Sequence, residues 1–598
     1  MTRNYSQLIP VLSLTAILFV SARGGAVDPS WPRGKRRLDA VASMASAGVK
    51  VLLPSQGMPA PQSGKPGVAA GAVRYAEQFP GTDFGDKLAN ACAALPPGGG
   101  TIDATRIRGA QTISNEDIFA KCASIPVTLL LGATSITCTG KSGAPGSSAC
   151  ISPRSHDKII GSGRNVSLIR AANGTPDWIR LIEPTPATTD LEFANFEIDG
   201  NKANITGLKV QNHGIMLNDS DGVSIHDMYI HDTNGDGITV WGGGLKQQGY
   251  TSNFDIEHNY IKNVQRAGVA IISGNRGKIS DNRFDQYLNF ESIHSEPDGS
   301  NQYVLDLTVT NNLIHGGGGI AIGGRAYDDN PHFRGATVTG NTLVNAGHLL
   351  VIDLPYSTVD GNTITDAPRT SYALDVETHD TTVVRNTVQF VNSEPPPNLE
   401  AGIVVYCTDK RVPKAGIGKN YVIDNTIRNS RHSGIEVFDC NDDVISLNTI
   451  DHVQPSSGSK MAIGILVRGE PIAGVKSRNI ITSNRIIDTF AVPTLTDGIY
   501  LEPGSTNTIV AYNTTADRAA KVVTLNGSTN LIIGNGQSID DLRVTAQSTF
   551  ADFLHARGAD VFCSDCKNAR DGVTPGSVCE KGGSGAPANR EGDVWKCF

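Results

Sequence analysis

The segment Asp236-Gly-Ile-Thr-Val240 is one copy of a short pattern that decides the fold of this chain. Each copy has a small or polar residue, then an apolar residue, any residue and a second apolar residue. Full copies also stand at 213–217, 267–271, 318–322, 401–405, 433–437, 463–467 and 497–501, and looser copies at 292–295, 349–351 and 374–376. Alternation with a period of two residues predicts a β-strand in every copy.

A second recurring feature lies between the copies: an Asn followed by a short apolar strand. It occurs at Asn259, Asn282, Asn312, Asn341, Asn362, Asn386, Asn425, Asn448 and Asn484. The closest spacings are 21 residues (341 to 362) and 23 residues (259 to 282), which is typical of a solenoid. A single strand cannot bury its apolar face alone, so the repeats must stack. The Asn residues fit the turns, where stacked amides can bond from coil to coil.

These repeats resemble the right-handed parallel β-helix superfamily typified by pectate lyases, and they cover roughly half of the chain. The resemblance implies an all-β, right-handed parallel β-helix. Residues 86–95 place Leu88, Ala91, Cys92 and Leu95 on one helical face before Pro96-Pro-Gly-Gly-Gly100, which resembles the N-terminal cap helix of that superfamily. The resemblance does not fix the activity, because this scaffold hosts lyases, hydrolases, epimerases, tailspike adhesins and binding proteins.

The predicted organisation has four parts. Residues 1–26 read as an export signal, with Arg3, the apolar run from Leu8 to Val20 and small residues up to Ala26. Residues 27–78 form a linker rich in Pro, Gly and Ala, residues 79–537 form the β-helix, and residues 538–598 form a C-terminal region with a Cys-rich module. No other segment is apolar enough to cross a membrane, so we expect a secreted, periplasmic or cell-surface protein without an integral membrane segment after signal cleavage.

The ten cysteines of an exported chain suggest disulfides. Cys407 and Cys440 follow adjacent repeat strands, and adjacent coils lie about 4.8 Å apart, so we predict a bridge between them. The last four cysteines, Cys563, Cys566, Cys579 and Cys597, form either two disulfides or a zinc site, and export favours the disulfides.

The repeat register also predicts which residues point outward from the strands. The candidate catalytic residues on or beside this outer column are Asp236, Arg266, His294, Glu296, Arg325, Asp375 and Glu377. The candidate substrate-binding residues are Trp241, Tyr406, Glu436, Phe438 and Tyr500. Aromatic faces stack on sugar rings, and carboxylates bond hydroxyl groups or bind Ca²⁺, so the pattern suits a polysaccharide. A solvated sheet face is the alternative interpretation of the same polar residues.

Composition and missing motifs limit the functional prediction. The net charge of −8 argues against a nucleic-acid partner. The characteristic motifs of polygalacturonase-like hydrolases, alginate epimerases and classical pectate lyases are absent. No metal site is predicted with certainty, and Ca²⁺ is the one cofactor considered.

We therefore expect a carbohydrate-active protein, first of all a lyase that cleaves a uronate-containing polysaccharide by β-elimination. Arg325 or Arg266 would neutralise the uronate, and His294 or Glu296 would act as the base. A β-helix glycoside hydrolase that uses Asp375 with Glu377 or another nearby carboxylate, or a uronan epimerase, is the enzymatic alternative. A non-catalytic polysaccharide-binding protein, surface adhesin or tailspike-like protein is the alternative from a different class.

Overall fold

The computed structural model describes residues 72–535 with internal gaps, and five strands between positions 543 and 597. The gaps are 115–116, 140–148, 176–178, 206–210, 243–248, 287–289, 325–329, 369–370, 392–393, 408–417, 457, 459, 469–477, 503–504, 516–520, 526–529 and 534. The predicted export signal and most of the predicted linker lie outside the described residues.

Three long parallel sheets make up most of the described chain, and we call them sheets A, B and C. The repeated pattern found in the sequence forms sheet C. Its strands are β6 Ala149–Ile151, β9 Arg180–Ile182, β12 His213–Asn218, β15 Ile238–Trp241, β18 Val269–Ile271, β22 Glu291–Ser295, β26 Gly319–Gly323, β30 His348–Ile352, β33 Tyr372–Glu377, β36 Ala401–Tyr406, β39 Ser433–Phe438, β42 Ile463–Arg468, β45 Asp497–Leu501 and β48 Lys521–Leu525.

Sheet B holds the strands that follow the repeated Asn residues. They are β3 Gly109–Ile113, β5 Thr134–Cys138, β8 Leu168–Ala171, β11 Glu197–Asp199, β14 Tyr229–His231, β17 Tyr260–Lys262, β21 Arg283–Asp285, β25 Leu313–His315, β29 Thr342–Val344, β32 Thr363–Thr365, β35 Thr387–Gln389, β38 Thr426–Arg431, β41 Thr449–Gln454, β44 Arg485–Ile487 and β47 Thr514–Thr515.

Sheet A lies between sheet C and sheet B in the order of the chain. Its strands are β1 Ala72–Tyr75, β2 Gly100–Ala104, β4 Val127–Leu131, β7 Lys158–Ile160, β10 Thr189–Ala194, β13 Asp221–His226, β16 Thr251–Glu257, β19 Gly274–Asn275, β20 Lys278–Ser280, β23 Val304–Leu305, β24 Thr308–Thr310, β27 Phe333–Arg334, β28 Thr337–Thr339, β31 Thr358–Asp360, β34 Thr382–Val384, β37 Tyr421–Ile423, β40 Val444–Ser446, β43 Ile480–Thr482, β46 Ile509–Ala511 and β49 Leu531–Ile533.

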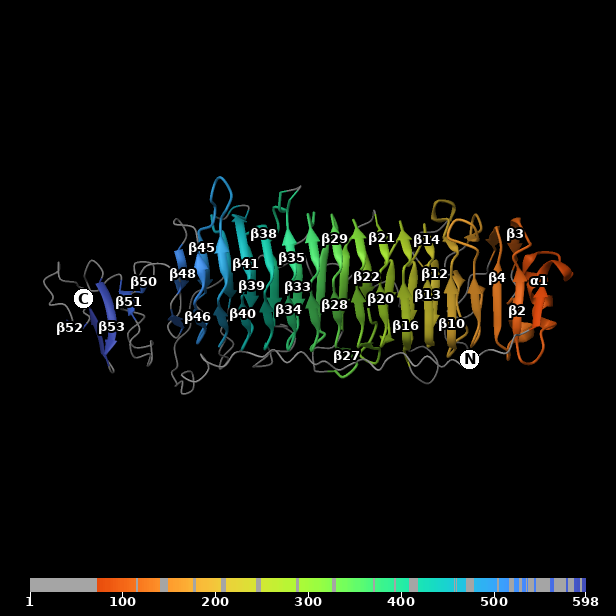
Figure 1. Ribbon diagram of the computed structural model, residues 1–598, viewed down its shortest axis with the longest axis horizontal. Helices are drawn as coiled ribbons and strands as arrows, with labels where there is room; N and C mark the ends of the chain where they lie inside the picture. The colour runs from red at the N-terminus through yellow and green to blue at the C-terminus, as the bar shows by residue number, and fades with distance from the viewer. Residues whose placement is uncertain are drawn as a thin grey trace, which may run out of the picture. The chain divides into compact units, whose positions relative to one another are not determined.

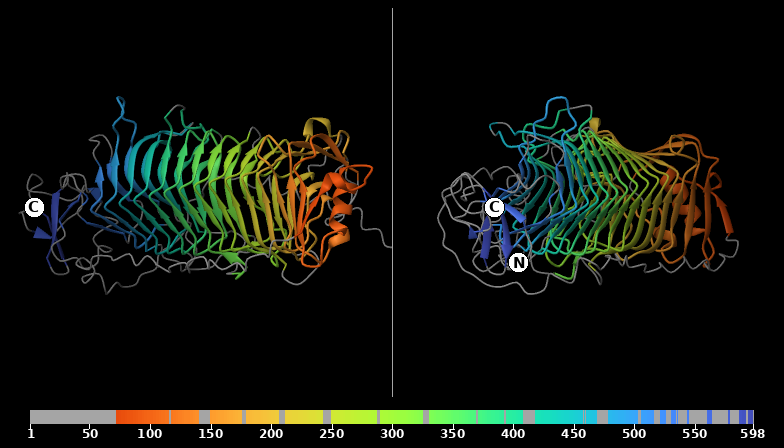
Figure 2. Two further views of the ribbon diagram at one scale, coloured as in Figure 1. Left: turned by 45° about the vertical axis from the view of Figure 1, so that its right-hand side comes forward. Right: turned by 60° about the vertical axis from the view of Figure 1, so that its left-hand side comes forward.

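Each coil runs through sheet C, then sheet A, then sheet B, and the next coil repeats that order. Strands β12, β13 and β14 form one such coil, and they pair in parallel with β15, β16 and β17 of the next. Figures 1 and 2 show the strands of successive coils lying side by side. The predicted parallel β-helix is therefore confirmed, and the apolar pattern builds it because stacking buries the same face of every repeat.

The core is a set of apolar columns inside the coils. In the coil of β13 and β14 it contains Val223, Ile225 and Ile230, all at most 2% exposed. The Gly of the repeated pattern has a steric reason. A Cβ on Gly237 would lie 2.7 Å from the Gly268 carbonyl oxygen and 3.2 Å from Cγ2 of Ile261. The strand of sheet C thus approaches the core column of sheet B too closely for a side chain.

The predicted role of the Asn residues is also confirmed. Asn341 Nδ2 donates to Oδ1 of Asn362 at 2.9 Å and to the Val309 carbonyl oxygen at 2.9 Å. The Asn341 backbone N–H donates to the same Asn362 Oδ1 at 3.0 Å. The same Nδ2–Oδ1 bond joins each Asn of the row to the next, from Asn259 to Asn535, and all of these side chains are buried. We call this row the Asn ladder; it satisfies buried backbone groups at each turn.

An α-helix, α1 Phe84–Ala93, packs against β2 and β3 at the first coil, as the sequence predicts (Figure 2). Its N-cap is Asp83, whose carboxylate accepts the Asp86 N–H at 2.9 Å. Phe84, Leu88 and Cys92 are buried, so the helix covers the apolar end of the coil. Two elements, β1 and the 3₁₀ helix Ala76–Gln78, come before residue 79, where the sequence predicts the β-helix to begin. At four residues, β1 is too short to show a period, and it is ordered by parallel pairing with β2.

Short 3₁₀ helices also occur at Ala120–Cys122 and Lys202–Asn204. No helix among the described residues is long and apolar enough to cross a membrane. The C-terminal strands β50 Arg543–Val544, β51 Asp560–Cys563, β52 Ser577–Val578, β53 Ala586–Glu591 and β54 Val594–Cys597 form a separate five-stranded sheet. The side chains of the four tail cysteines lie outside the described residues, so the choice between disulfides and zinc stays a prediction.

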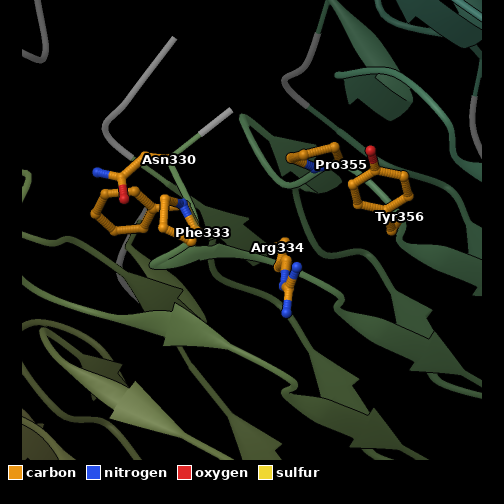
Figure 3. A pocket seen from close by; sticks show the side chains of 6 residues that line it. Asn330, Phe333, Arg334, Pro355 and Tyr356 are labelled. Atoms are coloured by element: carbon orange, nitrogen blue, oxygen red, sulfur yellow. The ribbon is translucent and has the colours of Figure 1, made fainter. Parts of the chain in front are cut away.

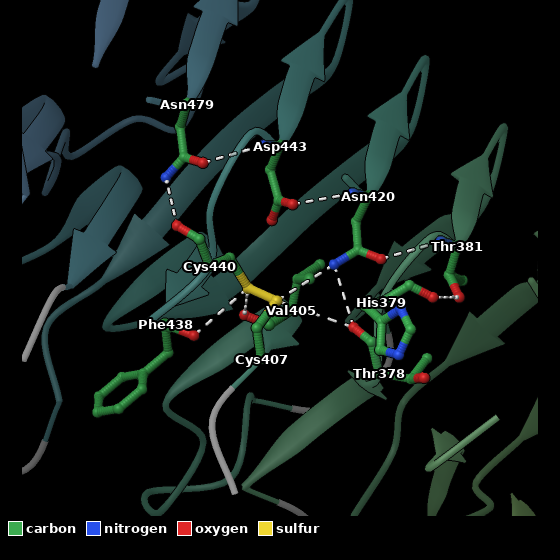
Figure 4. The surroundings of a disulfide bond; sticks show 10 residues. All are labelled: Thr378, His379, Thr381, Val405, Cys407, Asn420, Phe438, Cys440, Asp443 and Asn479. Carbon is green, nitrogen blue, oxygen red and sulfur yellow. Dashed lines mark hydrogen bonds between the residues drawn. A yellow bond between two sulfur atoms is a disulfide. The ribbon is translucent and has the colours of Figure 1, made fainter. Parts of the chain in front are cut away.

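Three disulfides join the described cysteines, and Cys407–Cys440 confirms the predicted pair. Its Cα atoms lie 4.9 Å apart, as expected for residues on neighbouring coils. The bridge lies beside a second polar row, in which Asn420 donates to Asp443 and Asp443 donates to Asn479 (Figure 4). The other two disulfides, Cys92–Cys122 and Cys138–Cys150, lie near the N-terminal cap.

Candidate functional site

The register column predicted from the sequence is present on sheet C, but only His294, Leu350, Asp375 and Tyr500 of its members are partly exposed, and the others are buried. In register order it runs Thr239, Ala270, His294, Ala321, Leu350, Asp375, Val404, Glu436, Leu466 and Tyr500. A parallel column lies two residues further along the strands. In it, Ile352 pairs with Glu377, Tyr406 pairs with Phe438, and Phe438 pairs with Arg468. We call the surface that these two columns form the C face.

One group of charged residues on the C face is centred on Arg266. Its Nη2 donates to Oε1 of Glu296, and its Nε lies 3.6 Å from Oδ1 of Asp236. Asp236 precedes β15, is 1% exposed and also accepts the Ala267 N–H at 3.1 Å. Asp236 Oδ2 lies 3.1 Å from His213 Nδ1. The structure thus brings together three predicted site residues from successive coils, and the positive charge of Arg266 is shared between two carboxylates.

The protonation of these two carboxyl groups differs. Burial by itself would raise the pKa of Asp236, but Arg266, His213 and the hydrogen bonds outweigh it and lower that pKa to about 2. The pKa of Glu296 is raised from its ordinary value, because burial and the nearby Asp236 outweigh the attraction of Arg266 and His294. Asp236 is therefore a permanent anion that holds Arg266, whereas Glu296 is poised to take or give a proton.

His294 lies next to this group, and Glu291 lies between His294 and His348. His294 Nδ1 is 3.3 Å from Oε2 of Glu291, and His348 Nε2 is 4.0 Å from Oε1 of the same residue. Burial lowers the pKa of His348 below its ordinary value, although the Glu291 carboxylate acts in the opposite direction. The ring of Phe290 packs against His294 with the ring centroids 5.3 Å apart. One carboxylate thus faces two imidazoles on the C face.

A second group of charged residues begins three strands further on, at Asp375 and Glu377 of β33. Both are partly exposed, and Asp375 Oδ1 is buried without a hydrogen-bond partner among the described residues. Burial raises the pKa of Asp375 well above its ordinary value, and the negative charges of Glu377 and Glu436 raise it further. A carboxyl group with a raised pKa is suited to the role of a general acid.

Glu436 lies two strands beyond Asp375 and is buried against Arg468. Its Oε1 is 3.1 Å from Nε of Arg468, which also lies 3.6 Å from Oε1 of Glu502. Burial raises the pKa of Glu436 to about 7, although Arg468 opposes that shift. Tyr372, at the start of β33, donates its hydroxyl to Oε2 of Glu400 at 3.0 Å. Burial and the surrounding carboxylates Glu436, Glu400 and Asp375 raise the pKa of Tyr372 as well. The pKa values of Asp375, Glu436 and Tyr372 are thus all raised at this end of the C face.

Aromatic side chains lie beside the second group. Tyr406 and Phe438 sit on adjacent strands with ring centroids 4.9 Å apart and ring planes inclined by 37°. By register, Tyr406 follows directly after Glu377 in its column. Trp241 and Tyr500 are partly exposed at either side, on β15 and β45. From the strand spacing these two residues are about 43 Å apart. A surface of that length can contact several consecutive sugar residues of a polymer.

The comparisons with known proteins identify the fold. Residues 192–346 and 412–537 match the family described as "Right handed beta helix region". The chain is a right-handed parallel β-helix. No curated protein sequence matches it.

Solved β-helix structures resemble the chain at low identity. The A-module of the mannuronan C-5 epimerase AlgE6 of Azotobacter vinelandii is 13% identical, with a TM-score of 0.33, over 78% of this chain and 99% of that one. The tailspike protein of E. coli bacteriophage HK620, solved with a pentasaccharide, is 14% identical, with a TM-score of 0.43, over 87% of each chain. The N-terminal fragment of gene product 12 of bacteriophage Phi29 is 14% identical, with a TM-score of 0.37, over 69% of this chain and 66% of that one. These similarities concern the fold alone.

Most of the predicted site residues lie in or beside the two groups described above, whereas Trp241 and Tyr500 lie at either side of them. Arg325 lies outside the described residues. Arg468, Glu502, Glu291, His348, Tyr372 and Glu400 are not among the residues predicted from the sequence. His348 has no neighbours at ligand spacing in the sequence. Its position opposite Gly319, which in turn pairs with Glu291, follows only from the strand register.

The carboxylates of the C face do not form a compact cation site within the described residues. The described groups of three potential ligands within 4.8 Å of one another are Asp199–His231–Asp232 on sheet B and Cys407–Cys440–Asp443 at the disulfide. The cysteines of the second group are already bonded to each other. Ca²⁺ binding on the C face therefore stays a prediction, and no chemistry below depends on it.

Proposed function

We propose that this β-helix is an exported carbohydrate-active enzyme that cleaves a polysaccharide bound along the C face. The observation that carries the proposal is the environment of Asp375. This acid points outward beside a second carboxylate, Glu377, its pKa is raised well above the ordinary value, and aromatic rings adjoin it. The three disulfides support export, because disulfides persist in oxidising compartments.

Hydrolysis is the chemistry that these residues support best. Glycoside hydrolysis needs one protonated carboxyl group to donate to the leaving oxygen, and one ionised carboxylate to activate water or attack the sugar. We assign the first role to Asp375 and the second to Glu377. Glu436 is buried, so we assign it a positioning role: its negative charge raises the pKa of Asp375 and keeps the acid protonated.

The distribution of charge disfavours a strongly anionic substrate on this face. The described carboxyl groups on or beside the C face outnumber the described arginines there, even with Asp375 protonated: they include Asp236, Glu291, Glu296, Asp375, Glu377, Glu436 and Glu502, against Arg266 and Arg468. Both arginines are ion-paired with carboxylates. A neutral polysaccharide would bind without the repulsion that a polyuronate would meet.

Uronate lyase activity is the second candidate, and the first charged group favours it. Glu296 has a raised pKa next to the guanidinium of Arg266, so it could accept the proton α to a uronate carboxyl group while Arg266 stabilises the resulting charge. This candidate ranks lower because Asp236 and Glu296 already neutralise Arg266.

A polymer screen tests the proposal and separates the two chemistries. The purified protein is incubated with neutral glucans, xylans and galactomannans, and with pectate and alginate. New reducing ends are measured together with the ultraviolet absorbance of unsaturated uronides. Hydrolysis predicts reducing ends without that absorbance, and elimination predicts both. Binding without cleavage of any polymer would contradict both candidates and support the binding-protein alternative.

A further inference from the structure

A small hollow lies away from the C face, on the coils of β27 and β31. It has a volume of about 140 Å³ and is lined by Asn330, Pro331, Phe333, Arg334, Pro355 and Tyr356. Figure 3 shows Pro355 and Tyr356 on one side, Asn330 and Phe333 on the other, and Arg334 between them. Phe333 is buried, whereas Tyr356 is 61% exposed. The hollow therefore has an apolar floor and an aromatic wall that is open to solvent.

Tyr356 occupies a backbone position that suits other residues better. Its φ of 64° lies in the left-handed region, which a bulky side chain adopts only at a cost in free energy. The equivalent positions on neighbouring coils hold Asp306, Gly335 and Asp380, also with positive φ. Asp and Gly are the residue types that tolerate this conformation. The backbone conformation of this turn therefore does not account for a Tyr at position 356.

The neighbouring coils leave one face of the Tyr356 ring uncovered. On the side of β27 the aligned residue is Gly335, which has no side chain and donates its N–H to the Pro355 carbonyl oxygen at 3.0 Å. On the other side His379 meets the ring edge-on, with ring centroids 6.3 Å apart. One face of the ring is therefore supported, and the other opens onto the hollow.

Arg334 supplies a cation at the same place. It is exposed and makes no ion pair with the residues that the structure describes. Aromatic rings from preceding coils also contact one another near the hollow: the Tyr250 and Tyr303 rings are tilted with centroids 4.6 Å apart, and Tyr303 stacks on His332 at 4.0 Å. His332 is adjacent in sequence to Pro331 and Phe333 of the hollow. The hollow thus combines an open aromatic face with a guanidinium that has no ion pair among the described residues.

We infer that this hollow is an accessory glycan-binding site, in which one sugar ring stacks on Tyr356 and Arg334 donates hydrogen bonds to the hydroxyl or carboxylate oxygens of that ring. An exposed aromatic face binds the apolar C–H face of a sugar, and the guanidinium fork suits paired oxygens. The inference rests on its own residues and does not depend on cleavage at the C face.

The test compares variants of the full-length protein in a background that does not cleave, Asp375→Asn with Glu377→Gln. Binding is measured by titration calorimetry with three probes: cellohexaose, a hexamer of galacturonate and a hexamer of mannuronate. Tyr356→Asn removes the ring but keeps a residue that tolerates positive φ. We expect its thermal midpoint to be equal to or above that of the background protein, and its affinity for at least one probe to fall about tenfold.

Tyr512→Asn is the matched control. Tyr512 is 62% exposed with a φ of 56°, but it does not line the hollow. Arg334→Gln should weaken the galacturonate and mannuronate hexamers more than cellohexaose if Arg334 binds a carboxylate, and all three equally if it binds hydroxyl groups. Failure of all three probes to bind, or equal losses in Tyr356→Asn and Tyr512→Asn, would overturn the inference. Absence of polymer cleavage by the wild-type protein would bear only on the proposed function.

Discussion

Asp375 and Glu436 lie two strands apart in one register column of sheet C, and Val404 alone stands between them in that column. The short side chain of Val404 provides no hydrogen bond to either acid. The charge of Glu436 therefore adds to burial and to the charge of Glu377 in raising the cost of ionising Asp375. This relationship helps to explain why the pKa of Asp375 lies well above its ordinary value although the side chain is partly exposed.

The pH dependence of activity should reflect that proton. Because Asp375 must be protonated to act as the general acid, kcat/KM should fall as the pH rises through its raised pKa. Glu436→Gln removes the neighbouring negative charge, which lowers the pKa of Asp375. We expect the alkaline limb of the pH–rate profile to move to lower pH in this variant. An unchanged alkaline limb in Glu436→Gln would argue against the assignment of the acid.

The aromatic residues of the C face should contribute to polymer binding. Tyr406→Ala, Phe438→Ala and Trp241→Ala each remove a ring that can stack on a sugar, and we expect each to weaken polymer binding by about tenfold. Affinity electrophoresis on gels that contain the cleaved polymer would measure this change. Tyr421→Ala is the control, because Tyr421 is 46% exposed on sheet A and lies off the C face. Equal weakening in all four variants would contradict a binding surface on sheet C.

Asp443 should make the stability of the protein depend on pH. Burial raises its pKa from the ordinary 3.8 to about 8, although the hydrogen bonds from Asn420 oppose the shift. Between these pH values the unfolded chain releases a proton that the folded protein keeps. The stabilising contribution of this group is therefore complete below about pH 4 and is lost as the pH rises towards 8.

Asp443→Asn should remove that contribution and allow the side chain to bond like its neighbours Asn420 and Asn479 (Figure 4). We expect the urea midpoint of the variant to exceed that of the wild type near pH 8, and its decline from pH 4 to pH 8 to be shallower. Asp424→Asn changes an exposed carboxylate after β37 and is the control. A wild-type pH profile in Asp443→Asn would show that the carboxyl group is not held in its neutral form.

The Asn ladder should be a major source of stability. Asn341→Ala leaves the Asn312 N–H and the Val309 carbonyl oxygen buried without their partners. Unsatisfied buried groups cost about 1–3 kcal/mol each, so we expect a loss of about 3 kcal/mol in the free energy of unfolding. Equilibrium unfolding in urea would measure it. Thr337→Ala, on the exposed surface of a neighbouring strand, should change it by no more than about 0.5 kcal/mol, and a similar change in Asn341→Ala would contradict this role.

The sequence predicted the fold and the C face well because both depend on periodicity. The repeated Gly-Ile pattern sets which residues point inward, and the outer column from Thr239 to Tyr500 followed from that register. Residues that reach the site from outside the pattern were harder to find. Glu400 precedes its strand and meets Tyr372 through a side-chain hydrogen bond, and His348 belongs to the site only through pairing over two strands. Contacts made by long side chains across coils have no period in the sequence.

The burial of Glu436 shows a second limit of sequence reasoning. The alternation places it outward, and an outward residue on a sheet is expected to be solvated. In the structure it is 0% exposed and paired with Arg468, so its charge acts on its neighbours rather than directly on a substrate. Direction relative to the strand could be predicted, but burial depends on what packs against that side of the sheet.

The kinetics of four single variants on a polymer that the protein cleaves test the central claim most directly. We predict that Asp375→Asn and Glu377→Gln each lower kcat/KM by at least about a hundredfold while the thermal midpoint is kept. Glu291→Gln and Glu296→Gln, which alter the other charged group, should retain most of the activity. Near wild-type activity in Asp375→Asn and Glu377→Gln, with activity lost in Glu296→Gln, would contradict hydrolysis at β33 and move the reaction to the residues around Arg266.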